Sequence, residues 1–254
     1  MINKLYKSFL IIKTIDNFPL AFKDKLGLVQ GEVVYKIRKT GLKFFARGGT
    51  EDMAEIVVVN SGYEYNLNNI SLPKTPTIID LGGHLGSFSI YIARSFKNKA
   101  KIFTFEPDKG NFKLLNRNIL LNKIKFINVQ NIAISNKNGK GHLKNEKMNT
   151  DAYYLDSSSK IFNCFVNTLP NAAHKLRIGK IDLLKIDVEG EEYAIFKHAK
   201  TLQFIKNNVD YIFMEYHDIN KSKNYKVIEK IIKEDFVIVN KRDNILTLKN
   251  KKLK

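Results

Sequence analysis

Residues 78–88 read Ile78-Ile-Asp-Leu-Gly-Gly-His-Leu-Gly-Ser-Phe88, and this stretch decides the fold that we expect. It joins a short apolar strand, 77–80, to a helix predicted over 87–96. Gly82 and Gly86 lack the Cβ atoms that would keep the backbone of this turn away from a ligand. Since open α/β sheets bind ligands at the carboxyl ends of their strands, the stretch predicts a binding turn at such an end.

Strands and helices alternate after this turn, which is typical of a parallel sheet with crossover helices. Further strands are predicted at 101–106, 126–130, 181–187 and 209–215, with helices at about 109–122, 191–198 and 225–233. The polar stretch 136–141 predicts a local hairpin, and 236–240 with 244–248 predict a terminal one. The sequence therefore predicts a Rossmann-like α/β fold with a seven-stranded, mostly parallel sheet ending in a C-terminal β-hairpin. This count favours a methyltransferase-type sheet over the six-stranded sheet of a dehydrogenase.

The N-terminal residues have a different pattern. We expect residues 1–72 to form a small accessory α+β subdomain and residues 73–250 to form the main domain. An amphipathic helix is predicted over 1–20, a hairpin from 32–38 and 42–47, and a short helix over 55–59 capped by Thr50 or Asp52. No apolar run approaches the roughly 18–20 residues that a bilayer span needs, and no signal-peptide cleavage site follows the first helix.

Composition limits the functional classes. The 254 residues include 43 basic and 25 acidic side chains, a formal net charge of +18, and a single cysteine, Cys164. That cysteine excludes an intramolecular disulfide, and we expect a cytoplasmic protein. No cluster has the spacing typical of metal ligands, so we expect no required metal, although Asp187, Glu215 and His217 could hold a divalent ion. The basic excess would suit a nucleic-acid partner, but the lysines are scattered along the chain, which favours a general compositional bias.

The first strand-to-helix turn points to a particular ligand. Its glycine spacing differs from the GxGxxG fingerprint of dinucleotide-binding proteins. S-adenosylmethionine carries no pyrophosphate, so the turn needs only to pass close to a sulfonium and an amino-acid group. Asp80 can favour the cationic end of that ligand electrostatically.

The next two strand ends complete the predicted cofactor site. Glu106 ends the second strand, where a carboxylate can accept hydrogen bonds from both ribose hydroxyls. Asn131, or a backbone amide near Ala133, is expected to meet the adenine edge after the third strand. Together with the glycine turn that follows the first strand, Glu106 predicts an adenosine-type cofactor.

Polar residues at the fourth and fifth strand ends are the catalytic candidates. Asp187 follows a buried strand, and Glu215 and His217, two residues apart, project to the same side of an extended chain. Histidine titrates near neutral pH, so His217 is our predicted general base, with Asp187 or Glu215 orienting it or the substrate hydroxyl. We expect in-line displacement of the sulfonium methyl group, with positioning as the main contribution of the protein.

Five segments together resemble the FkbM family of methyltransferases. They are 79–88, 105–107, 131–135, 182–191 (Asp182-Leu-Leu-Lys-Ile-Asp-Val-Glu-Gly-Glu191) and 215–217, and Arg47-Gly-Gly-Thr-Glu-Asp52 also looks like a segment that precedes the fold in many members. The resemblance implies a class I methyltransferase fold, S-adenosylmethionine, and methyl transfer usually to a hydroxyl of a sugar, glycan or polyketide-like natural product. His84 departs from the pattern, since members commonly carry Asn there. The cofactor-binding residues that we assign are Asp80, Gly82, His84, Gly86, Phe88, Glu106, Asn131, Ala133 and Asp187.

Two other functions stay open. An RNA-directed methyltransferase would keep the cofactor site and use the basic surface to hold a phosphate backbone. A non-catalytic nucleotide-binding module would leave the residues around Asp187 and His217 as helix caps and edge charges. We expect a small-molecule or glycan acceptor, whereas the sequence does not indicate an oligomeric state.

Overall fold

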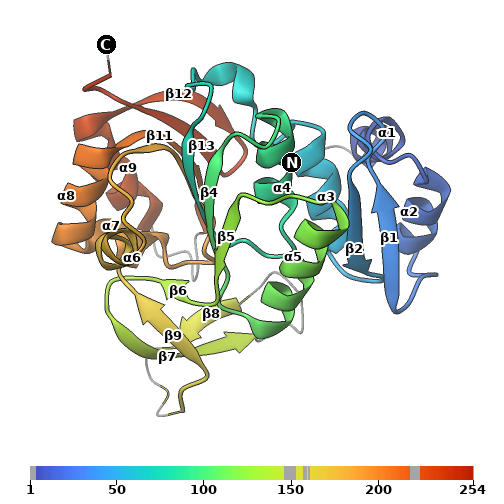
Figure 1. Ribbon diagram of the computed structural model, residues 1–254, viewed down its shortest axis with the longest axis horizontal. Helices are drawn as coiled ribbons and strands as arrows, with labels where there is room; N and C mark the ends of the chain where they lie inside the picture. The colour runs from blue at the N-terminus through green and yellow to red at the C-terminus, as the bar shows by residue number, and fades with distance from the viewer. Residues whose placement is uncertain (1–3, 146–152, 157–158, 160, 218–223, 254) are drawn as a thin grey trace.

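A sheet of seven strands crosses the centre of the molecule (Figure 1). The computed structural model describes residues 4–145, 153–156, 159, 161–217 and 224–253. The strand order is β12-β13-β11-β10-β3-β4-β5. The strands are β3 (Thr77–Leu81), β4 (Lys101–Phe105), β5 (Ile127–Gln130), β10 (Ile181–Ile186), β11 (Val209–Glu215), β12 (Phe236–Arg242) and β13 (Ile245–Asn250). Strands β5, β4, β3, β10 and β11 run parallel, and β13 and β12 add an antiparallel hairpin. The expected mostly parallel α/β sheet with a C-terminal hairpin is confirmed.

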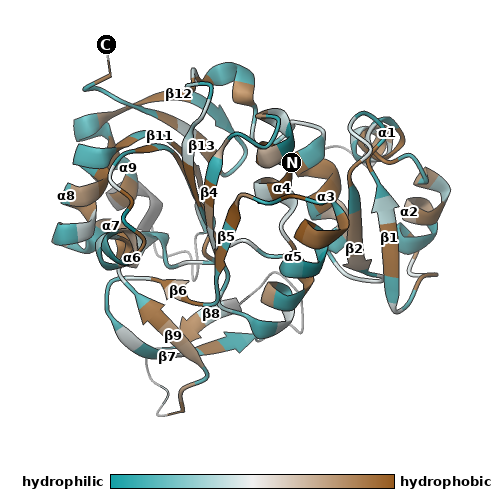
Figure 2. Cartoon of the chain, viewed as in Figure 1, coloured by the Kyte–Doolittle hydropathy of each residue, from teal (hydrophilic) through white to brown (hydrophobic). Residues whose placement is uncertain are grey.

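Hydrophobic clusters cover both faces of this sheet. Successive residues of a strand point to opposite faces, so Leu183 and Leu184 of β10 belong to different clusters. The first cluster includes α4 (Ser87–Ser95) and α5 (Lys109–Leu121); the second includes α6 (Leu169–Lys175), α7 (Glu192–Lys197), α8 (Ala199–Asn208) and α9 (Asn224–Asp235). Figure 2 shows hydrophobic residues along β4 and both hydrophobic and hydrophilic residues on α5. Because helices cover it on both sides, β10 is buried along its whole length.

The N-terminal residues form two helices, a hairpin and a third helix. Their bounds are α1 (Lys4–Thr14), α2 (Phe18–Lys25), β1 (Glu32–Lys36), β2 (Lys43–Arg47), α3 (Asp52–Asn60) and the short 3-10 turn η1 (Leu67–Asn69). The predicted hairpin is confirmed by antiparallel pairing of β1 with β2. The single helix predicted over 1–20 is wrong: the chain turns after Thr14 and a second helix starts with Pro19 in its first turn, where proline is tolerated.

Asn118 of α5 and Asn122, which directly follows this helix, hold the hairpin against the main sheet domain. Asn118 accepts a hydrogen bond from the Phe45 backbone N–H at 2.7 Å and donates to the Phe45 carbonyl at 3.0 Å. One turn later, Asn122 makes the same pair of bonds to Lys43. These side chains satisfy the edge of β2, which would otherwise present unpaired backbone groups. The N-terminal elements therefore dock on α5, as the right side of Figure 1 shows.

A second, four-stranded sheet was not predicted. It contains β6 (Ala133–Ile134), β7 (Gly139–Asn145), β8 (Tyr153–Asp156) and β9 (Cys164–Asn167), in the order β6-β9-β7-β8. The local hairpin predicted over 136–141 is corrected, because β7 begins at Gly139 and pairs with β8 and β9. Helices α6 and α8 were also missed. Within the described part of the chain, no helix has the length and apolar character needed to cross a membrane.

Candidate functional site

A cavity of about 660 Å³ opens at the carboxyl ends of the central parallel strands. Its wall comes from the segments that follow β3, β4 and β10, from the last residue of β11, and from α3 of the N-terminal region. The predicted site residues that line it are Gly82, His84, Glu106, Ala133, Asp187 and Glu215. The fold thus brings together residues that lie more than a hundred positions apart in the sequence.

Glycines shape the turn after β3. The backbone of Gly82 has φ +84°, and a Cβ atom on it would lie 1.8 Å from the carbonyl oxygen of Asp187. A Cβ atom on Gly83 would lie 2.3 Å from the Cγ2 atom of Thr104. Both glycine N–H groups donate to the carbonyl of Phe105 at 3.0 Å. The turn is therefore fixed between the ends of β4 and β10, at a separation that only glycine permits.

Glu106 connects two loops at the cavity wall. One carboxylate oxygen accepts a hydrogen bond from the backbone N–H of His84 at 2.7 Å, and the other accepts from that of Asp108 at 2.8 Å. Burial raises the pKa of Glu106 to about 7, although His84 and these backbone bonds act in the opposite direction. Each carboxylate oxygen has a second lone pair, so Glu106 can still accept hydrogen bonds from two ligand hydroxyls.

Asp80 lies behind the turn, where it contacts a buried lysine that we did not assign. The ammonium group of Lys185 lies 2.8 Å from the carbonyl oxygen of Gly82, 3.2 Å from Asp187 and 3.4 Å from Asp80. The other oxygen of Asp80 accepts a hydrogen bond from Ser89 at 2.6 Å. Asp80 is fully buried and does not line the cavity. A charged residue within the apolar strand 181–186 was the signal that could have identified Lys185.

His84 is held by the N-terminal region. Its Nε2 atom lies 3.3 Å from a carboxylate oxygen of Asp52 and 3.2 Å from Arg47. Arg47 also binds Asp52 through its backbone and guanidinium groups. Burial lowers the pKa of His84, but the Asp52 carboxylate outweighs it and raises the pKa above its usual value. The histidine that departs from the family pattern is therefore fixed at the cavity by the segment 47–52.

Two acids of the N-terminal region were missed as site residues. Glu55 of α3 and Glu64 both line the cavity. Burial raises the pKa of Glu55 to about 7, against the attraction of Lys185. Burial and the nearby carboxylates of Glu55 and Glu215 raise the pKa of Glu64 to about 10. An acid inside the apolar run 53–59 was the available signal for Glu55, whereas Glu64 lies in a polar segment that gave none.

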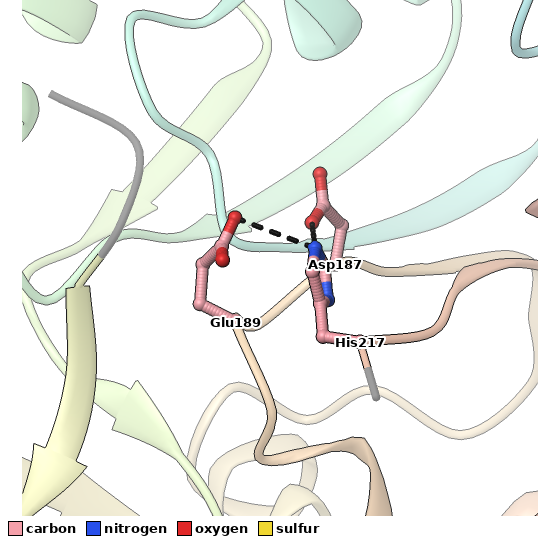
Figure 3. Close-up of side chains that lie close together, drawn as sticks. All are labelled: Asp187, Glu189 and His217. Carbon is pink, nitrogen blue, oxygen red and sulfur yellow. Dashed lines mark ion pairs between the residues drawn. The ribbon is translucent and has the colours of Figure 1, made fainter. Parts of the chain in front are cut away.

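His217 lies among carboxylates at the ends of β10 and β11 (Figure 3). Its Nδ1 atom is 3.0 Å from Glu192, and its Nε2 atom is 3.5 Å from Glu189, 3.7 Å from Glu215 and 4.0 Å from Asp187. Burial lowers the pKa of His217, but the carboxylates of Glu192, Asp187 and Glu189 raise it to about 10. An imidazole that already holds its proton cannot accept another, so the predicted role of His217 as a general base requires that proton to leave first.

Three other predicted cofactor residues support the site from behind. The side-chain amide of Asn131 donates to the carbonyls of Glu106 and Pro107, which fixes the loop after β4. Gly86, with φ +92°, precedes α4. Phe88 is buried against the ring of Tyr65, with 5.0 Å between centroids. None of these three lines the cavity, whereas Ala133 does.

The cavity lining is rich in carboxylic residues, although the whole chain is basic. Nine carboxylic residues line the cavity, against two lysines, whereas the chain as a whole carries a formal net charge of +18. The acids are Asp24, Glu51, Glu55, Glu64, Glu106, Asp187, Glu189, Glu191 and Glu215. The acids that are ionised attract positively charged ligands, whereas burial keeps a proton on Glu64 at neutral pH. The cavity therefore suits a ligand that carries positive charge and hydroxyl donors.

Comparisons with known proteins identify methyltransferases as similar. The family model described as the Methyltransferase FkbM domain matches residues 80–238. Over 58 residues the chain is 41% identical to Methyltransferase sdnD of Sordaria araneosa, a match that covers 23% of this chain and 21% of that protein.

Solved methyltransferase structures are similar at low identity. Methyltransferase FkbM from Methylobacillus flagellatus KT is 14% identical with a TM-score of 0.48, covering 77% of this chain and 53% of that one. P. horikoshii TYW2 in complex with MeSAdo is 15% identical with a TM-score of 0.45, covering 91% and 80% of the two chains. The chain thus spans about half the length of the FkbM structure and about a fifth of sdnD.

Proposed function

The chain belongs to the FkbM methyltransferase family, and from this premise we propose that it transfers the methyl group of S-adenosylmethionine to a hydroxyl oxygen of a sugar, glycan or natural product. One observation carries the proposal: the glycine turn at Gly82 and the carboxylate of Glu106 face one acidic cavity at the carboxyl ends of β3 and β4. Such a crevice is where open α/β sheets bind their ligands.

The residues present fit this methyl donor. A cavity of about 660 Å³ lies within the range of roughly 300–1,000 Å³ that is usual for small-ligand sites. Glu106 would hold the ribose hydroxyls, and Ile132 and Ala133 would border the adenine. Gly82 and Asp187 would lie on the side of the sulfonium, whose positive charge the surrounding carboxylates favour. Asp80 would act through Lys185 as a positioning residue.

The chemistry requires an acceptor oxygen aligned with the methyl group. When bound, S-adenosylmethionine would supply a methyl group on a cationic sulfur, with the neutral thioether as its leaving group. The protein contributes mainly by holding the two reactants in line. Glu215 lines the cavity beside Asp187 and is the group that receives the hydroxyl proton. His217 orients these carboxylates.

The proposal is tested by methyl transfer in solution. Purified protein is incubated with methyl-labelled S-adenosylmethionine and a panel of sugars, glycans and hydroxylated natural products, with RNA as a further acceptor. We expect S-adenosylhomocysteine together with an acceptor heavier by one methylene group. The exposed His174 supplies a control, since His174→Gln should match the wild type. Methylation of RNA alone would replace our acceptor class, and absence of any S-adenosylmethionine binding would refute the proposal.

A further inference from the structure

Asp187, Glu189 and His217 meet beside the cavity, although two of them follow β10 and the third follows β11 (Figure 3). Each offers one possible ligand atom, and these atoms all lie within 4.8 Å of one another. We propose that these three residues bind a divalent cation next to the methyl-transfer site. The sequence predicts no required metal but leaves Asp187, Glu215 and His217 as residues that could hold a divalent ion; the structure places Glu189, rather than Glu215, in the cluster with Asp187 and His217.

The separations of the three side chains suit a cation better than direct hydrogen bonds. The Nε2 atom of His217 lies 3.5 Å from Glu189 and 4.0 Å from Asp187. Charge-assisted hydrogen bonds are shorter, at about 2.7–2.9 Å. Metal–ligand bonds of about 2.1 Å place neighbouring atoms of a tetrahedral site ~3.4 Å apart. Small side-chain movements would therefore bring the three atoms to coordination distance of one ion.

A residue outside the cluster fixes the histidine ring. Glu192 of α7 is buried, and its carboxylate lies 3.0 Å from the Nδ1 atom of His217. The same oxygen accepts a hydrogen bond from the backbone N–H of Val188. Histidine ligands of metals usually donate their second ring N–H to a carboxylate, which directs the other nitrogen toward the ion. Glu192 supplies that contact and turns Nε2 toward Asp187 and Glu189.

Lys185 orients Asp187, another of the three proposed metal ligands. Its ammonium group binds the Oδ2 atom of Asp187 at 3.2 Å and is itself fixed on the carbonyl of Gly82. The remaining oxygen, Oδ1, is the one nearest His217. Lys185 balances one carboxylate, whereas Glu189 and Glu215 add two more within 4.0 Å of the imidazole. A cation bound here would displace the Nε2 proton of His217, because a histidine ligand must be neutral, and these carboxylates would then balance the charge of the ion.

The ligand set indicates the class of ion and its use. Imidazole suits Zn²⁺ and related transition metals, and carboxylates suit Mn²⁺ and Mg²⁺, so a mixed set favours Mn²⁺ or Zn²⁺ over Mg²⁺. Three protein ligands leave coordination positions open, as at other catalytic metal sites. These positions would hold oxygens of the acceptor, and for acceptors with adjacent hydroxyls they would hold two. This last step rests on the proposed methyl transfer.

Binding of Mn²⁺ and Zn²⁺ alone tests the site. Metal-free full-length protein is titrated with Mn²⁺, followed by electron paramagnetic resonance, and with Zn²⁺, followed by calorimetry. We expect one site for each ion. His217→Gln and Glu189→Gln should each weaken binding at least tenfold, and Glu192→Gln, which removes a charge but retains an oxygen acceptor, should weaken it about tenfold. The control His174→Gln should bind as the wild type does.

Thermal unfolding shows which variants are folded. The folded variants with a substituted metal ligand decide whether the proposed site exists. Absence of uptake at millimolar Mn²⁺ and Zn²⁺, or uptake that His217→Gln and Glu189→Gln leave unchanged, would overturn the proposal. S-adenosylhomocysteine binding is measured on the same samples. Metal uptake without binding of that ligand would refute the methyl-transfer proposal alone, and the reverse result would refute the cation site alone.

Discussion

At the scale of single residues, Glu106 has the most directly testable role. Its carboxylate is buried, yet it lines the cavity and links the backbone of the β3 turn to the loop after β4. Ligand binding at this position depends both on the protonation of the Glu106 carboxyl group and on hydroxyl donors in the ligand.

Ligand affinity should depend on the ionisation of Glu106. Burial raises its pKa to about 7, so the carboxyl is neutral below that pH and gains its full acceptor capacity above it. We expect the affinity for S-adenosylhomocysteine to rise about tenfold between pH 6 and pH 8. Calorimetry of wild type and Glu106→Gln across this range separates the effect from titration of the ligand itself. An equal pH dependence in both proteins would contradict the assignment.

Gly82 should tolerate no side chain. A Cβ atom would lie 1.8 Å from the Asp187 carbonyl, on a backbone with φ +84°. The left-handed conformation and the clash together should cost Gly82→Ala about 2–5 kcal/mol of unfolding free energy, along with ligand binding. Urea unfolding measures this loss. Gly179→Ala is the matched control, since nothing lies within 4 Å of its added Cβ atom.

At the scale of elements, Lys185 joins β10 to β3. Its ammonium group contacts Asp80 of β3, Asp187 after β10 and the carbonyl of Gly82, and the side chain is 2% exposed. Burial disfavours its charge, but Asp187 and Asp80 outweigh this and raise the pKa of Lys185 above its usual range. The two central strands thus share one buried charge network.

Removal of this lysine should destabilise the sheet. Lys185→Met leaves Asp80 and Asp187 without their cation, and breaking a buried ion pair costs about 3–5 kcal/mol. The double variant Asp80→Asn/Lys185→Met should recover part of the loss, because it removes one of the uncompensated charges. Lys180→Met, which removes a half-exposed surface pair with Asp210, should cost at most about 1 kcal/mol. Equal losses for the two lysines in urea unfolding would contradict the network.

Elements of the main sheet were predictable because their signals are local. The apolar runs at 77–81 and 181–186 and the turn at Gly82 directly indicate buried strands and a binding turn. The small sheet β6-β9-β7-β8 was missed because most of its strands are short and because β6 and β9 pair although they are far apart in the sequence. Lys185 was overlooked for a related reason: its partners Asp80 and Gly82 lie a hundred residues earlier, and only the parallel pairing of β3 with β10 brings them together.

At the scale of the whole molecule, the N-terminal region and the sheet share one hydrophobic cluster. Tyr35 and Phe44 of the hairpin belong to the same cluster as Ile78 and Leu183 of the central strands. The same region also supplies cavity residues, among them Glu55. The acidic character of the site was therefore not predictable from the strand ends alone, because part of it comes from α3.

This shared core predicts the result of a truncation. A chain of residues 73–254 would expose the apolar surface of α4 and α5 that now packs on the N-terminal elements. We expect it to lack cooperative thermal unfolding and to bind a hydrophobic dye. Cooperative unfolding with intact ligand binding would instead show that residues 1–72 are the separable subdomain proposed from sequence.

The central claim is that one adenosyl ligand bridges the glycine turn and Glu106. A crystal structure of the protein with S-adenosylhomocysteine tests this most directly. We predict ribose hydroxyls within hydrogen-bond distance of Glu106 and the sulfur on the side of Gly82 and Asp187. A ligand bound elsewhere, or bound here with Glu106 facing no hydroxyl, would contradict it.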